Sequence, residues 1–305
     1  MMNISENSTN STENASIPPS NNGDYTGPCS TSGCRAVAVI ISLIAIPGAL
    51  ANLLVCVRVA ADPRLRTPTF TALALLALAD FLFIILKYNS VVVLHFFYNG
   101  FATTPFSLLV MDSLATISGA SSAYHVVLLY SFRYFKLVYP LKGYLWFTVK
   151  KILAISGGVW LGCTIFISAY IVTVYVMADS HPLLAFVFNI ITTIVMAVLP
   201  LLIILILHFM KTAKLKHSIA ATRADVTRIM SRMVTAIVIV YIITTTPANI
   251  RDIVSLGFQS LDSPAYKVFE EICRVLMFVN FAANPFIYLL FSSQFRESVS
   301  TCLVC

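Results

Sequence analysis

Charged residues are scarce in this chain, and their scarcity excludes an ordinary soluble domain. Asp, Glu, Lys and Arg together make up 11% of the 305 residues, whereas 58% of the residues are hydrophobic. Soluble globular domains usually carry about 25% charged residues, and a chain this apolar would expose too much apolar surface in water. The composition therefore indicates an integral membrane protein and also excludes disordered, collagen-like and disulfide-scaffold classes.

Cysteine is the second residue type whose pattern excludes a class of site. The seven cysteines are scattered, and their spacings match neither a zinc site nor a disulfide framework.

The first 35 residues are rich in possible glycosylation sites. They contain four N-x-S/T sequons, at Asn3, Asn7, Asn10 and Asn14. A segment rich in Ser, Thr and Asn forms sequons by chance, but we favour a glycosylated extracellular tail because the charge distribution agrees with it.

Long apolar stretches fill most of the remaining sequence. A helix needs about 20 apolar residues to cross a hydrocarbon core of roughly 30 Å. Such stretches lie at 36–59, 69–95, 105–135, 150–174, 185–210, 228–255 and 267–291. Neither a fixed repeat nor a similarity between inverted halves is visible, which argues against the common transporter folds. We therefore predict an all-α membrane fold, a bundle of seven transmembrane helices over 36–291, followed by a cytoplasmic segment at 292–305.

The distribution of basic residues orients these stretches in the membrane. If the segments after the first, third, fifth and seventh stretches face the cytoplasm, only Arg35, Lys87, Arg251, Lys267 and Arg274 of the 20 Lys and Arg residues remain on the other side. Basic residues concentrate on the cytoplasmic side of membrane proteins. We therefore predict a multi-pass plasma-membrane protein whose N-terminus is extracellular and whose C-terminus is cytoplasmic. Its short loops leave no room for a soluble catalytic domain, so we expect neither an enzyme nor a nucleic-acid partner.

Two local patterns bear on contacts with membrane lipids and with a second copy of the chain. Ser293 to Ser300 is predicted to form a short amphipathic eighth helix, followed by Cys302 and Cys305, for which palmitoylation and unmodified thiols are equal alternatives. Gly158 and Gly162 form a G-x-x-x-G pattern in the fourth stretch. This pattern is compatible with a homodimer, although close packing inside one bundle is the more common reason for it.

Ionisable residues within the membrane are costly, so each one is a candidate site residue. Asp80 lies in the middle of the second stretch and cannot stay charged there without polar partners or water. Asn280 and Asn284 are four residues apart on the seventh stretch and complete a middle polar layer. An outer layer contains Lys87, Asp112, Arg251, Asp252, Glu270, Glu271 and Arg274. Its mixed charge predicts a ligand pocket, and the alternatives are local pairs of Lys87 with Asp112 and of Glu270 with Arg274.

Short motifs follow one another in a fixed order along the stretches. They are Gly48 to Asn52, Leu-Ala-Leu-Ala-Asp ending at Asp80, Phe132-Arg133-Tyr134 followed by Pro140-Leu141, Trp160, Pro200, Pro247, Asn284-Pro285-Phe286-Ile287-Tyr288, and Phe295-Arg296. Each motif is weak evidence alone. Their order and spacing resemble those of class A, rhodopsin-like G-protein-coupled receptors over residues 36–300.

This resemblance implies a site in the middle of the membrane and a switch near the cytoplasm. The implied sodium and water site consists of Asp80, Ser122, Asn280 and Asn284, and no other metal or cofactor is implied. The implied switch consists of Arg133, Tyr134, Pro247 and Tyr288, which would rearrange as the sixth helix swings outward. The opened crevice would accept a heterotrimeric G protein. The expected contacts of that G protein are Arg133, Leu141, Arg228 and Arg232.

Several positions depart from the pattern of the family that the chain resembles. Phe132 stands where an acidic residue normally restrains the arginine, so we expect raised signalling without ligand. Thr245 replaces the usual tryptophan of the sixth helix, and His208 replaces a tyrosine of the fifth. Leu108 replaces the usual cysteine at the top of the third helix, so the disulfide typical of the family cannot form. The remaining alternatives are a bond from Cys29 or Cys34 to Cys273, or a bond between Cys29 and Cys34.

The expected ligand pocket consists of Lys87, Asp112, Arg251 and Arg274. Lys87 and Arg274 favour an anionic ligand such as a carboxylate lipid or a nucleotide, whereas Asp112, Glu270 and Glu271 would equally meet a cationic peptide. Ala115 and Phe278 stand where aminergic receptors and opsins carry their ligand-binding residues, which argues against both. The sequence therefore predicts a receptor that binds an extracellular ligand and activates G proteins. The alternatives are a peptide-binding or constitutively active receptor and a non-signalling decoy.

Overall fold

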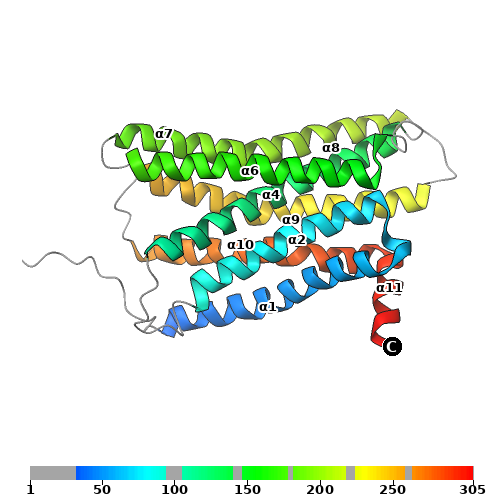
Figure 1. Ribbon diagram of the computed structural model, residues 1–305, viewed down its shortest axis with the longest axis horizontal. Coiled ribbons are helices and arrows are strands. Elements are labelled where there is room, and N and C mark those ends of the chain that lie inside the picture. The colour runs from blue at the N-terminus through cyan, green and yellow to red at the C-terminus, as the bar shows by residue number, and fades with distance from the viewer. Residues whose placement is uncertain are drawn as a thin grey trace, which may run out of the picture.

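The chain folds into a bundle of long helices. The computed structural model describes residues 32–93, 105–139, 146–177, 181–217, 224–257 and 263–304, and every regular element within them is helical. The long helices are α1 (Ser32–Ala61), α2 (Pro68–Tyr88), α4 (Pro105–Val138), α6 (Val149–Met177), α7 (Pro182–Thr193), α8 (Leu199–His217), α9 (Ala224–Gly257) and α10 (Pro264–Phe291). They lie side by side, whereas α11 (Ser293–Val304) crosses one end of the bundle (Figure 1).

These helices have the length and composition of membrane spans. Among the described residues, six spans are long and apolar enough: α1, α2 with the following π-turn Asn89–Val93, α4, α6, the joined α7 and α8, and α10. Helix α9 contributes a shorter apolar stretch, Thr235–Arg251. Large apolar side chains such as Leu43 and Leu290 point away from the bundle, as lipid-facing residues do. The prediction of an all-α bundle of seven transmembrane helices is confirmed.

Local sequence signals set where several helices begin. Thr67 precedes α2, and its hydroxyl accepts a hydrogen bond from the Phe70 amide at 3.5 Å. Ser263 precedes α10, and its hydroxyl accepts one from the Tyr266 amide at 3.2 Å. In both cases a proline follows directly, where its fixed φ angle suits the first helical position and its missing N–H is not needed.

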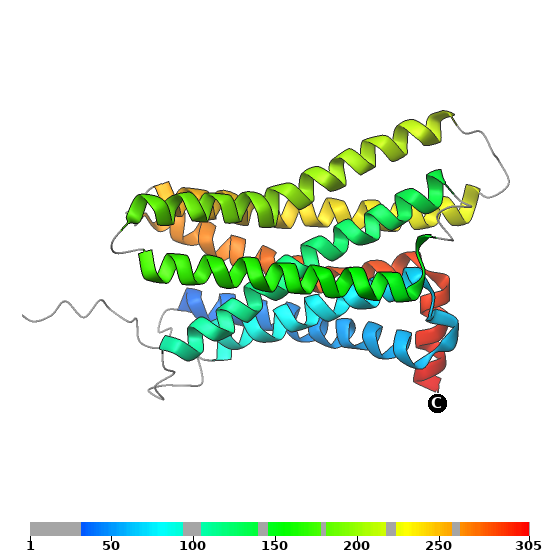
Figure 2. The same cartoon turned by 45° about the horizontal axis from the view of Figure 1, so that its top comes forward.

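The fifth membrane helix bends where α7 passes into α8 (Figure 2). The turn at Ile194–Val198 is a π-helix, and Pro200 follows it. A proline cannot donate the helical hydrogen bond, and a π-turn accommodates the bend that results. The Val195 carbonyl in this turn accepts a hydrogen bond from the hydroxyl of Tyr124 on α4 at 2.6 Å. The bend is therefore tied directly to the neighbouring helix.

Glycines on α1 and α6 differ in how closely they are packed. A Cβ atom placed on Gly48 of α1 would overlap the Cβ of Ala282 on α10 and lie 2.9 Å from its Cα, so only glycine allows this contact. By contrast, Cβ atoms on Gly158 and Gly162 of α6 would meet no described atom within 4 Å. The prediction that this G-x-x-x-G pattern packs inside the bundle is therefore wrong. Both glycines are on the outward face of α6, where the homodimer alternative stays a prediction.

Helix α11 is the predicted amphipathic eighth helix, although it extends beyond Ser300 to Val304. Its Phe295 ring is buried, and Val299 packs against the same apolar cluster. The guanidinium of Arg296 donates hydrogen bonds to the carbonyls of Leu289 and Leu290 at 3.0 and 2.8 Å. These carbonyls belong to the last turn of α10, where a cation also interacts favourably with the helix dipole. The bonds fix the turn from α10 into α11.

Candidate functional site

Asp80 is the centre of a buried polar site that joins three helices. It is completely buried midway along α2. Its Oδ1 accepts a hydrogen bond from Ser122 Oγ of α4 at 2.5 Å, and its Oδ2 accepts one from Asn284 Nδ2 of α10 at 2.7 Å. Ser122 and Asn284 lie 42 and 204 positions after Asp80 in the sequence. The structure therefore brings together three of the four residues expected in the sodium site.

Asn280, the fourth of these residues, has a different partner. Its Oδ1 accepts a hydrogen bond from Thr244 Oγ1 of α9 at 3.1 Å. Asn280 and Asn284 share a face of α10, but they are one turn apart, about 6 Å along the helix axis. That separation is enough to give the two amides partners on different helices. Asn280 therefore links α10 to α9, one turn away from the bonds that surround Asp80.

Two further buried residues have polar atoms that lack partners. The amide nitrogen of Asn52 donates to the carbonyls of Gly48 and Phe281, both at 3.0 Å, and so links α1 to α10. Asn52 Oδ1 and the Tyr288 hydroxyl are buried without a hydrogen-bond partner among the described residues. Tyr288 lies close enough to Asp80 to interact with it electrostatically. Buried polar atoms are normally paired, so these atoms offer hydrogen-bonding capacity to a water molecule or an ion.

A multivalent metal finds no ligand set in this region. Within the described part of the chain, no three His, Cys, Asp or Glu side chains lie close enough together to bind a metal ion. One carboxylate, one hydroxyl and amide groups instead form a weak oxygen-rich set of the kind that suits a monovalent cation and water.

The arginine of the expected switch is half-buried, and no described residue provides it with an acidic partner. Nε and Nη2 of Arg133 have no hydrogen-bond partner among the described residues. Its neighbour Phe132 is buried and directs its ring edge towards Phe147, with ring centroids 5.2 Å apart. Lys136 Nζ lies 5.9 Å from the centroid of the Phe132 ring. Phe132 therefore forms an aromatic contact at the position where the family pattern has an acidic residue.

The other residues of the expected switch are spread along the bundle. Tyr134 is buried and packs edge-on against Phe135, which places it in the aromatic cluster at the end of α4. Pro247 lies inside α9. Tyr288 is buried on α10, in the apolar cluster that also contains Phe132.

Two histidines form interhelical bonds that the sequence did not assign. His208 Nδ1 on α8 and the Tyr130 hydroxyl on α4 are 2.7 Å apart. His125 Nδ1 lies 2.6 Å from the Ser121 carbonyl, and its Nε2 lies 2.7 Å from Ser156 Oγ on α6. A carbonyl only accepts, so Nδ1 of His125 carries the hydrogen and Nε2 of the neutral ring accepts from Ser156. A lone histidine in an apolar helix was the only sequence signal for either bond.

The side chain of Asp252 in the expected outer layer is not described, so we define the outer charged layer as Lys87, Asp112, Arg251, Glu270, Glu271 and Arg274. Two of its cations form ion pairs within the described part of the chain. Lys87 of α2 pairs with Asp112 of α4, as one of the sequence alternatives predicted. Arg274 donates to both carboxylate oxygens of Glu271 at 2.8 and 3.0 Å, so the predicted pair of Glu270 with Arg274 is wrong. Glu270 is half-buried and has no hydrogen-bond or ion-pair partner among the described residues. Arg251 is half-buried on α9.

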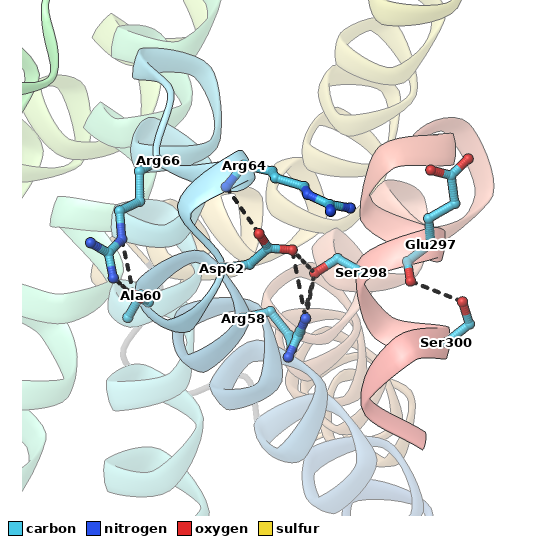
Figure 3. Close-up of polar contacts among 8 residues, drawn as sticks. All are labelled: Arg58, Ala60, Asp62, Arg64, Arg66, Glu297, Ser298 and Ser300. Carbon is cyan, nitrogen blue, oxygen red and sulfur yellow. Dashed lines mark hydrogen bonds and ion pairs between the residues drawn. The ribbon is translucent and has the colours of Figure 1, made fainter. Parts of the chain in front are cut away.

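At the opposite end of the bundle, a polar cluster fastens α11 to the end of α1 (Figure 3). Arg58 donates to Ser298 Oγ from Nε and Nη2 at 3.2 and 2.8 Å, and Ser298 Oγ donates to Asp62 Oδ2 at 2.9 Å. Asp62 Oδ1 accepts from the Arg64 amide at 2.9 Å. The Arg64 amide, then the Ser298 hydroxyl and the nearby guanidinium groups hold the pKa of Asp62 below its ordinary value. We call Arg58, Asp62 and Ser298 the α1–α11 clamp.

Some predicted residues lie outside the described part of the chain. These are the sequon asparagines Asn3, Asn7, Asn10 and Asn14, together with Cys29, Leu141 and Cys305. The side chains of Cys34, Arg228 and Cys302 are likewise not described, whereas Arg232 is exposed on α9 and Cys273 is buried in α10. The glycosylation, palmitoylation and disulfide assignments therefore stay predictions.

Comparisons with known proteins agree with this arrangement. Residues 51–288 match the family described as 7 transmembrane receptor (rhodopsin family). The chain is 27% identical to somatostatin receptor type 5 of Bos taurus, over 93% of this chain and 82% of that protein. It is 26% identical to neuromedin-U receptor 2 of Mus musculus, over 89% of this chain and 76% of that protein. Somatostatin receptor type 4 of Rattus norvegicus is 25% identical, over 90% and 75% of the two chains.

Proposed function

Because the chain belongs to the rhodopsin family of seven-transmembrane receptors, we propose that it binds an extracellular peptide and activates a heterotrimeric G protein. In this proposal the N-terminus is extracellular, and the outer charged layer faces the ligand. The peptide contacts this layer through a cationic group, either a basic side chain or an amino terminus. Binding favours the arrangement in which α9 has moved outward about Pro247, and the cytoplasmic end then accepts the G protein.

The pairing of charges in the outer charged layer is the observation that supports a cationic peptide as the ligand. An anionic ligand would need a free cation, but Lys87 and Arg274 are each neutralised by a neighbouring carboxylate. Glu270 is the acid in this layer that has no partner among the described residues. A half-buried carboxylate gains more from a cation than a solvated one, because there is less water to screen the pair. The similar receptors are named for somatostatin and neuromedin U, which are peptides.

The first test applies somatostatin, neuromedin U and pools of basic peptides to cells that express the receptor and G-protein dissociation sensors. For any peptide that activates it, Glu270→Gln should lower potency by about tenfold or more, because a desolvated charge pair contributes well over the 1.4 kcal/mol that tenfold requires. Glu270→Asp should retain most of the response. Glu297→Gln on α11 is the matched control, because it removes a carboxylate at the other end of the bundle.

The opposite pattern would support the anionic alternative. An acidic lipid or nucleotide that activates the receptor, and whose effect is lost in Arg274→Ala but kept in Glu270→Gln, would exclude a cationic peptide as the ligand. Surface expression, measured with an N-terminal epitope tag on intact cells, must be equal among the variants. The same tag tests the orientation, since it reacts with antibody without permeabilisation only if the N-terminus is outside.

The second part of the proposal is a sodium ion at Asp80. The carboxylate has two neutral hydrogen-bond donors but no cationic side chain among its partners, and a buried charge without compensation is costly. A sodium ion would supply the missing charge, with Asp80, Ser122 and Asn284 as its nearest protein groups. The thermal stability of the purified receptor should therefore rise when sodium replaces choline at constant ionic strength. This difference should disappear in Asp80→Asn, and a sodium effect of equal size in that variant would exclude the site.

A further inference from the structure

The buried polar site has a layer of three residues directly outside it. Phe83, Gly119 and Phe281 each lie three positions from a member of that site, namely Asp80, Ser122 and Asn284. Helix α2 runs towards the outer layer, whereas α4 and α10 run away from it, so all three displacements have the same direction. Three residues of an α-helix correspond to about 4.5 Å along the axis. The three residues therefore form one level of the bundle, between Asp80 and the outer charged layer.

The contacts within this level are tight. The rings of Phe83 and Phe281 are stacked, with centroids 3.7 Å apart and planes inclined by 23°. A Cβ atom on Gly119 would lie 3.0 and 3.1 Å from two ring carbons of Phe83 and 3.5 Å from the ring of Phe281. The absence of a side chain on Gly119 thus lets both rings lie against the backbone of α4. Both phenylalanines are buried.

The two rings, rather than their neighbours, cover the outer side of the Asp80 site. Helix α9 presents Thr244 and Thr245, whose side chains are too small to cover the site. The next buried residues outward, Ala115 and Phe278, continue the same apolar cluster. The Asn280–Thr244 contact supplies polar groups at this height on the α9 side. On the side of α2 and α4, an ion that travels from the outer layer to Asp80 must cross the two rings, where it would lose most of its hydration.

We propose that Phe83 and Phe281, stacked against Gly119, form an aromatic partition that controls access to the Asp80 site from the extracellular side. The proposal deepens the proposed function, because the cation at Asp80 would enter through this level. Passage requires the two rings to separate, and the separation exposes the carboxylate to water from the outer side. A ligand that moves α2 relative to α10 would change the frequency of this event, and so the exchange of the cation.

The test measures access to the site itself with a probe that needs no ligand. Ser122→Cys places a thiol next to Asp80, and intact cells are treated with a small, membrane-impermeant methanethiosulfonate that carries an ammonium group. Labelling of the introduced thiol should be slow in the otherwise unchanged receptor. It should become about tenfold faster when Phe83→Ala or Phe281→Ala is added. The contact between two stacked rings favours the closed arrangement over the open one by roughly this factor, and either substitution removes it. Receptors without Ser122→Cys give the background from the native cysteines.

Two variants separate an opened partition from a loosened bundle. Phe70→Ala removes a buried ring of the same size from α2, but on the cytoplasmic side of Asp80, so it should leave the labelling rate unchanged. Phe83→Leu keeps apolar volume but lacks a flat ring, and it should give an intermediate rate even if Phe83→Ala is poorly expressed. Equal rates in Phe83→Leu and the parent, or equal acceleration by Phe70→Ala, would overturn the proposal.

The labelling result is independent of sodium. If labelling accelerates as expected but the thermal stability does not respond to sodium, the partition stands and the sodium part of the proposed function fails. If stability responds to sodium and the labelling rate is the same in all variants, the sodium site stands and the partition fails.

Discussion

Phe132 allows a sharp test of how the resting state is held. Two buried nitrogens of Arg133 have no partner among the described residues, and Phe132 fills the neighbouring position with a ring packed on Phe147. We predict that the receptor signals without ligand and that Phe132→Asp lowers this basal output. The added carboxylate would give the guanidinium a partner in the resting arrangement, and that partner would be lost when the switch rearranges.

The magnitude follows from comparing two variants of equal size. Both Phe132→Asp and Phe132→Asn lose a buried aromatic ring, which costs about 3–5 kcal/mol in protein cores, so this loss cancels between them. What remains is the difference between a charged and a neutral acceptor for Arg133. Hydrogen bonds between neutral groups contribute about 0.5–1.5 kcal/mol and those to charged groups about 1.5–3 kcal/mol. The difference of about 1–1.5 kcal/mol corresponds to a shift of roughly five- to tenfold in the equilibrium between the two arrangements.

The assay is second-messenger output without ligand, normalised to surface expression. The unchanged receptor should exceed mock-transfected cells, the Asn variant should remain above them, and the Asp variant should fall clearly below the Asn variant. Thermal stability of the purified proteins shows whether both variants fold. Two results would refute the reasoning: basal output of the unchanged receptor equal to that of mock cells, or equal output from the Asp and Asn variants.

Two further predictions concern the contacts that hold the bundle together. Gly48→Ala should lower thermal stability by an amount equivalent to about 1–3 kcal/mol, because the new methyl group overlaps Ala282. Gly158→Ala is the control and should have no such effect, because its added methyl group meets no described atom. Equal effects of the two substitutions would contradict the packing of α1 on α10. Asp62 has a lowered pKa in the folded chain. Its contribution to the α1–α11 clamp is therefore complete above the ordinary aspartate pKa of about 3.9 and is lost as pH falls through the lower folded value. Spectroscopic distances between labels on α11 and the α1–α2 turn should therefore lengthen in acid. They should not do so in Asp62→Asn, which has no carboxylate to titrate, or in Ser298→Ala, which lacks the donor to that carboxylate.

The sequence was sufficient for the class, the number of spans and most of the central site. Composition identified a membrane protein, because no soluble fold tolerates so few charges. Asp80 stood out because a carboxylate in an apolar helix needs partners, and the motif order of the family identified Ser122 and Asn284 as two of them. The structure adds the geometry: both partners donate directly to the carboxylate.

Side-chain pairings across helices were harder to predict. From the sequence, Arg274 was expected to pair with Glu270 at a spacing of four residues. A spacing of three residues also meets on a helix surface, and Arg274 pairs with Glu271 instead. The G-x-x-x-G pattern of α6 was misassigned because a spacing pattern does not say which face of a helix is covered. The rotation of each helix about its axis, which decides both questions, depends on all neighbouring side chains together.

The stacked rings and the α1–α11 clamp had no recognisable signal in the sequence. Phenylalanine is a common residue in membrane helices, and Phe83 and Phe281 become informative only when Gly119 is placed against them. Ser298 lies on an amphipathic helix whose sequence predicts only an apolar face. Its bonds to Arg58 and Asp62 depend on the position of α11 across the end of the bundle.

Helix α10 contributes to every level of the molecule, and this makes it the element that connects the two ends. Glu270 and Arg274 lie in the outer charged layer, Phe281 in the aromatic partition, and Asn284 at the Asp80 carboxylate. The Phe281 carbonyl also accepts the amide of Asn52, so α10 is fixed to α1 at the level of the partition. In the proposed mechanism, a ligand bound at the outer layer therefore acts on the opposite end of the bundle by a small rigid movement of α10 relative to α2. Such a movement would separate the stacked rings and lengthen the bond from Asn284 to Asp80 in the same step.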